Sequence, residues 1–118
     1  MAAAQAGATA SAPTLPTDFP PDVQAVEPAV LQDALSGKVF RVQPARGAGW
    51  RLEFRPNGYA FINTTNGQAD SGRWSVQGTQ LCVQWQSLPG GCSEMRLKQD
   101  ALYLKRASNA EVVALRPD

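Results

Sequence analysis

The chain has 118 residues with a net charge of +1, which allows one small domain and gives no overall charge signal for binding nucleic acid or an anionic membrane. Histidine is absent, and this excludes Ser-His-Asp and Cys-His catalysis. Two cysteines without histidine make a metal site improbable, and no glycine-rich phosphate loop precedes a helix pattern. We therefore expect a protein that is not an enzyme and has no cofactor.

Residues 1–21 are expected to be disordered or extended, because they are rich in Ala, Thr, Ser and Pro and contain little to bury. They lack the charged start and the apolar centre of a signal peptide, and they resemble the stretch that follows a removed signal. No run approaches the ~20 apolar residues that a membrane span needs, so we expect no membrane insertion.

Residues 22–37 are predicted to form a lead-in and one short helix. Pro28 suits the first helical turn, and Gly37 suits the position just past the last one. The apolar face of this helix would consist of Val30, Leu31, Ala34 and Leu35. So short a helix needs a surface to dock on, and the open end of a barrel would provide one.

Residues 38–118 switch to an apolar period of two, with turn residues between short runs. The predicted strands are 38–43, 50–55, 59–64, 71–77, 81–86, 92–98, 101–106 and 111–116. Regular spacing without intervening helices predicts an all-β fold, an eight-stranded antiparallel up-and-down meander that closes into a small lipocalin-like barrel.

The turns also set the register of these strands. With Gly58 in the left-handed region, Phe54 lies opposite Ala60, and the other turns likewise place apolar residues opposite one another. The face that this register buries contains Phe40, Val42, Trp50, Leu52, Phe54, Ile62, Trp74, Val76, Leu81, Val83, Trp85, Met95, Leu97, Leu102 and Leu104, with Val113 and Leu115 expected to join it. These side chains are sufficient to fill one small barrel.

The same register places Cys82 directly opposite Cys92 on the outer face, although the cysteines were not used to derive it. Directly opposed residues lie near disulfide distance, so we predict a disulfide, with two free neighbouring thiols as the alternative. A persistent disulfide indicates an oxidising compartment, which here means the periplasm or the exterior.

The outer face is the first candidate binding site. Its predicted residues are Arg51, Glu53, Arg55, Tyr59 and Phe61. An exposed cluster of aromatic and arginine side chains is typical of a partner-binding patch.

Two simpler interpretations of the outer face remain open. Glu53, between two arginines, fits an ordinary solvated row of charges. The aromatic residues could be covered by the N-terminal arm through Leu15, Phe19 or Val23. Charge favours such a contact, because residues 1–37 carry −4 and residues 38–118 carry +5.

The barrel interior is the second candidate site. Trp50, Trp74 and Trp85 are all predicted to point inward, where they would either line a ligand cavity or simply fill the core.

The pattern Gly-x-Trp-x-Val at residues 72–76, Leu-Cys-x-x-Trp at residues 81–85 and then Cys92 resembles a group of small exported proteobacterial domains of unknown function. The runs at residues 35–40 and 54–58 are similar to that group's opening strand and first hairpin. The resemblance covers about residues 31–106. It implies a lipocalin-like periplasmic barrel and carries over no catalytic residues.

From these observations we expect a non-enzymatic periplasmic or secreted binding module, which engages a protein or envelope component through its outer face. The alternative is a carrier or sensor of a small apolar ligand inside the barrel.

Overall fold

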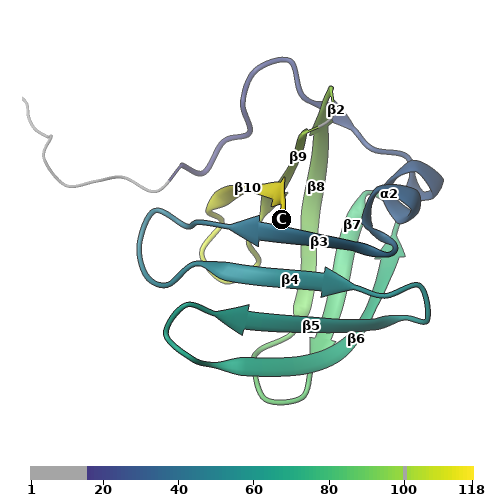
Figure 1. The fold of residues 1–118 in the computed structure, drawn as a ribbon. Coiled ribbons are helices and arrows are strands. Elements are labelled where there is room, and N and C mark those ends of the chain that lie inside the picture. The colour runs from purple at the N-terminus through teal and green to yellow at the C-terminus, as the bar shows by residue number, and fades with distance from the viewer. Residues whose placement is uncertain (1–15, 100) are drawn as a thin grey trace, which may run out of the picture.

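The computed structural model describes residues 16–99 and 101–118, which form a closed antiparallel barrel with one short helix (Figure 1). The barrel strands are β3 (Lys38–Val42), β4 (Trp50–Phe54), β5 (Tyr59–Thr64), β6 (Ala69–Gln77), β7 (Gln80–Trp85), β8 (Gly91–Lys98), β9 (Ala101–Lys105) and β10 (Val112–Pro117). Each strand pairs with the next, and β10 returns to β3. The predicted eight-stranded meander is confirmed, with strand ends within two residues of the expected positions.

The predicted register is also confirmed. Phe54 lies opposite Ala60, and Met95 lies opposite Leu104. Gly58 has a φ of 93°, the left-handed conformation that its three-residue loop requires. The alternation of apolar and polar positions therefore places one face of every strand in the core and the other face outside.

Helix α2 (Pro28–Leu35) closes one end of the barrel (Figure 1). Leu31 and Leu35 are fully buried in the barrel core, so the helix gains from this docking the stability that its length does not provide. Val30, which we expected on the buried face, is 48% exposed. It precedes Leu31 by one position and is thus rotated about 100° away from the buried side. In the described residues, 16–99 and 101–118, no helix has the length and apolar character needed to cross a membrane.

The lead-in to the helix adds a short strand that the sequence did not predict. Strand β2 (Gln24–Ala25) pairs with Arg96 and Leu97 of β8, beyond Glu94, which pairs with the first residue of β7. Earlier in the arm, the carbonyl of Pro16 accepts a hydrogen bond from the N–H of Val112 at 2.6 Å. Residues 16–25 therefore run from β10 to β8. The rest of the predicted arm, residues 1–15, lies outside the described residues.

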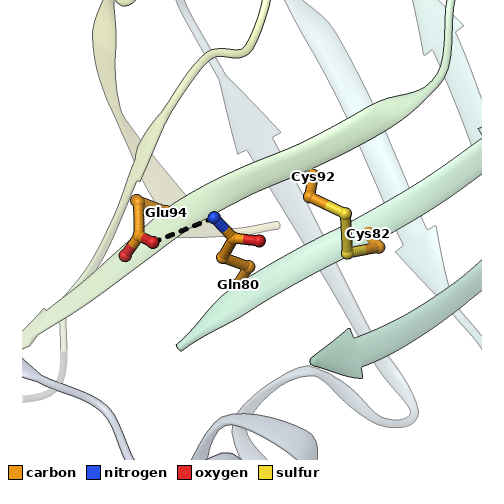
Figure 2. The surroundings of a disulfide bond; sticks show 4 residues. All are labelled: Gln80, Cys82, Cys92 and Glu94. Carbon is orange, nitrogen blue, oxygen red and sulfur yellow. Dashed lines mark hydrogen bonds between the residues drawn. A yellow bond between two sulfur atoms is a disulfide. The ribbon is translucent and has the colours of Figure 1, made fainter. Parts of the chain in front are cut away.

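Cys82 and Cys92 form the predicted disulfide, with their Cα atoms 4.0 Å apart (Figure 2). The next pair on the same face of β7 and β8 is Gln80 and Glu94, whose side chains share a hydrogen bond of 3.0 Å. The bridge thus joins the two strands from outside the barrel, while the intervening Leu81 is buried within it.

We predict that the double variant Cys82→Ala/Cys92→Ala has a free energy of unfolding lower by roughly 2.5–3 kcal/mol, the entropy of closing a loop of ten residues. Urea denaturation of the variant and of wild type measures this difference. Wild-type protein unfolded in a reducing agent is the control and should match the variant. A difference below about 0.5 kcal/mol would show that the bridge contributes little.

Candidate functional site

No helix of residues 16–99 or 101–118 covers the end of the barrel opposite α2. Four loops surround it, at residues 43–49, 65–68, 86–90 and 106–111 (Figure 1). A cavity of about 490 Å³ opens between them into the barrel. This volume lies within the range of small-molecule sites.

The cavity wall is mainly apolar. Aliphatic and aromatic side chains from the strands form its depth, and the loop residue Leu88 lies at its mouth. Thr64, Gln68, Ser93 and Ser108 contribute the uncharged polar side chains of the wall. An apolar cavity with a few polar groups can bind a small molecule that is itself largely apolar.

The three tryptophans divide between the two ends of the barrel. Trp50 and Trp85 line the cavity and are partly buried. Trp74 is not part of the cavity wall. Its indole Nε1 donates to the carbonyl of Arg55 at 2.8 Å, and its ring packs edge-on against Phe54 with centroids 5.5 Å apart. Of the three tryptophans predicted to line a cavity, the structure therefore places Trp50 and Trp85 at the cavity. Trp74 lies outside it, against Phe54.

A buried carboxylate holds two of the rim loops together. Glu111 is only 1% exposed. One of its oxygens accepts from Arg106 at 2.9 Å, and the other accepts the N–H of Ala45 at 2.7 Å. Arg106 also lies over the ring of Trp50, at 4.6 Å from its centroid. The loop at residues 43–49 is thus fastened to the hairpin at residues 106–111.

Opposing effects act on the pKa of Glu111. Burial alone would raise it, but the N–H of Ala45 and the guanidinium of Arg106 outweigh that effect, so the pKa is lower than usual. Because the folded pKa is below the unfolded one, the ionised carboxylate stabilises the fold at neutral pH. That stability is lost as the pH falls through the folded value.

Asp70 holds the third rim loop in a similar way. One of its carboxylate oxygens accepts the backbone N–H groups of Ser87 and Leu88, each at 2.9 Å. The Leu88 and Ser87 amides are the main reason that the pKa of Asp70 is lowered. This contact fixes Leu88 at the cavity mouth, where its side chain packs against the core.

The five predicted outer-face residues do lie together on β4, on β5 and, for Arg55, directly after β4, because Glu53 is opposite Phe61 in the register. Glu53 pairs with Arg55 at 2.9 Å, and Arg55 in turn lies 4.6 Å from the centroid of Phe61. Arg51 pairs with Asp118 at 3.0 Å. These contacts agree with the row of paired charges considered above.

Tyr59 is the most exposed aromatic side chain of the described residues on this face, with 44% of the residue accessible to solvent. Arg73 lies beside it, 4.7 Å from the ring centroid. The arm does not cover it within the described residues, since Phe19 lies instead against Arg96 of β8 at 5.0 Å. The alternative that Phe19 covers the aromatic residues of the outer face is therefore wrong. Val23 directly precedes β2, which pairs with β8 and not with β4 or β5, and Leu15 lies outside the described residues.

Within the described residues, the acidic side chains of residues 16–37 form no ion pairs with the barrel. Among residues 16–99 and 101–118, the ion pairs do not involve Asp18, Asp22, Glu27 or Asp33. Hydrogen bonds of the backbone and the Phe19–Arg96 contact hold the arm in place. The arm does lie back on the domain, but not for the electrostatic reason that we expected.

Comparison with protein-family models, with curated proteins and with solved structures gives no match to this chain. The resemblance to exported proteobacterial domains therefore stays a prediction. In the part of the chain that the structure describes, no group of three or more His, Cys, Asp or Glu side chains is placed to hold a metal ion.

Sequence reasoning missed the residues that shape the cavity mouth, namely Asp70, Arg106 and Glu111. Their common signal is weak, because all that they share is a charge within two positions of the end of a strand. Glu111 carries the strongest sequence signal of the three, because it directly precedes an apolar strand, and a carboxylate that is buried there needs specific partners.

We predict that Glu111→Gln lowers the free energy of unfolding at pH 7 by about 1–3 kcal/mol, because the ion pair with Arg106 is lost and the single amide oxygen cannot accept from both Arg106 and Ala45. The difference from wild type should shrink as the pH falls below the ordinary glutamate value of about 4.3, where the native carboxylate also becomes protonated. Urea denaturation from pH 7 to pH 3 measures both effects.

Glu27→Gln is the matched control, because Glu27 is exposed and its side chain does not cap the helix that follows it. It should change stability by less than about 0.5 kcal/mol. If Glu111→Gln were equally silent at pH 7, the carboxylate would not be holding the two loops.

Proposed function

We propose that the protein is a binding module for a small, largely apolar ligand, which enters the open end of the barrel. The observation that carries this proposal is the cavity of about 490 Å³ with Trp50 and Trp85 in its wall. Burying an apolar ligand among such side chains is favourable by roughly 25 cal/mol for each Å² removed from water. A carrier or a sensor would both use the cavity in this way.

The cavity mouth supports the proposal because it is held in shape. Asp70 and Glu111 bind backbone N–H groups of two rim loops, so a ligand meets a site that is already formed. A preorganised site loses less conformational entropy on binding than a flexible one.

We place the protein in the periplasm or outside the cell, because the disulfide between Cys82 and Cys92 persists in an oxidising compartment. A small apolar molecule there needs a protein to cross an aqueous space. The resemblance to exported proteobacterial domains points to the same compartment.

We predict that the neutral dye N-phenyl-1-naphthylamine binds with saturation, giving the fluorescence increase of an apolar site. Ala107→Trp should weaken this binding at least about tenfold, because Ala107 is exposed at the cavity mouth and an indole there fills the entrance. Ala29→Trp is the matched control, since Ala29 is exposed on α2 at the closed end, and it should leave the affinity within about twofold. Equal effects of the two variants, or no saturable binding, would contradict the proposal.

The outer face is a second candidate, as a surface for a protein or envelope component. It is favoured by the exposure of Tyr59, which the described arm leaves open. It is also favoured by a row of arginines, because Arg41 lies opposite both Arg51 and Arg116. Asp118 pairs with two of these three arginines, so the row keeps a positive excess that suits an acidic partner.

For this second candidate we predict that Tyr59→Ala/Phe61→Ala abolishes capture of a specific partner from an envelope extract, while dye binding in the barrel persists. Val30→Ala is the control, because it removes the other large exposed apolar side chain of the described residues and should leave capture intact. Quantitative mass spectrometry of the captured proteins measures the outcome. A partner that the double variant still captures would rule out this face.

A further inference from the structure

The cavity wall contains one charged side chain among the described residues, Arg106. We propose that the cavity takes an amphipathic monocarboxylate, with its apolar body among the barrel side chains and its carboxylate bound by the Arg106 guanidinium. The inference rests on the proposed function and deepens it by naming the chemical class of the ligand.

Three contacts fix Arg106 in position before any ligand arrives. Its backbone N–H donates to the carbonyl of Glu111 at 2.7 Å, across the base of the hairpin. Its guanidinium donates to the Glu111 carboxylate at 2.9 Å and lies 4.6 Å from the centroid of the Trp50 ring. A long side chain that is already ordered loses little rotamer entropy when it binds a ligand.

The guanidinium still has donors to offer. It carries five N–H groups, and within residues 16–99 and 101–118 Glu111 is the only hydrogen-bond partner of this side chain. A carboxylate matches the planar fork of a guanidinium, and such charge-assisted bonds are roughly twice as strong as neutral ones. Arg106 can therefore bind a second carboxylate without releasing Glu111.

Among the described residues, the cavity wall holds no carboxylate that could bind a basic ligand, and the nearby Glu111 is not part of the wall. Glu111 is buried, and both of its oxygens are occupied by Arg106 and by the N–H of Ala45. A neutral apolar ligand would cover part of the guanidinium without replacing the hydrogen bonds to water that it loses. A carboxylate at Arg106 compensates for that loss.

The test compares three ten-carbon molecules that differ at one end: decanoate, methyl decanoate and decylamine. Each displaces N-phenyl-1-naphthylamine from the protein at pH 7. The inference predicts that wild type binds decanoate at least about tenfold more tightly than the ester, and the amine most weakly. Equal affinity for acid and ester would overturn it.

Arg106→Met keeps an unbranched side chain but removes the donors, so within this variant the ratio of the acid and ester dissociation constants should fall to about one. Because this change leaves a buried carboxylate unpaired, Arg106→Met/Glu111→Gln provides a second variant without the stranded charge. A preference for decanoate that survives in either variant would overturn the role of Arg106.

The results also separate the inference from the proposed function. Saturable dye binding without a preference for the acid overturns only the inference. Absence of dye binding to wild type overturns both.

Discussion

Closure of the sheet leaves the inward-facing side chains no place to pack except against each other, and this constraint determines both ends of the barrel. At one end α2 supplies the fully buried Leu31 and Leu35, and Trp74 packs edge-on against Phe54, which also lines the cavity. No comparable element docks at the other end among the described residues. The inward side chains there cannot fill the space alone, and the cavity is the consequence.

The loops around that cavity are held by hydrogen bonds rather than by apolar packing alone. Asp70 binds the N–H groups of Ser87 and Leu88, and Glu111 joins Ala45 to Arg106. Carboxylates suit this task, because each has two oxygens that can satisfy backbone donors which would otherwise be left unpaired near an apolar wall. The same contacts that order the rim therefore also place a guanidinium in the cavity wall.

The strand order and the register could be predicted because the apolar period of two and the turn residues agree with each other along most of the chain. A slip by one residue would move Leu81 out of the core and separate Cys82 from Cys92, so few alternatives remained. Strand β2 could not be predicted, since its two residues are exposed and pair with a part of β8 that β7, beginning only at Gln80, does not reach.

The candidate site was less accessible to sequence reasoning. Alternation shows that Trp50, Trp74 and Trp85 point inward, but not at which end of the barrel each lies or whether that end is filled. That depends on the docking of α2, which is a property of the whole fold. For the N-terminal residues, the contact with the barrel was predicted but its cause was not. Net charge suggested ion pairs, whereas Phe19 and backbone hydrogen bonds make the contact.

The central claim is that a ligand binds among the side chains of the open end, and the tryptophans test it directly. Each indole N–H gives a separate signal in a ¹⁵N–¹H correlation spectrum, so Trp74 serves as an internal control for Trp50 and Trp85. During titration with a small apolar ligand, the account predicts that the Trp50 and Trp85 signals shift with saturation while the Trp74 signal, hydrogen-bonded to Arg55, stays in place. Shifts confined to backbone signals around Tyr59, with all three indoles unmoved, would contradict it.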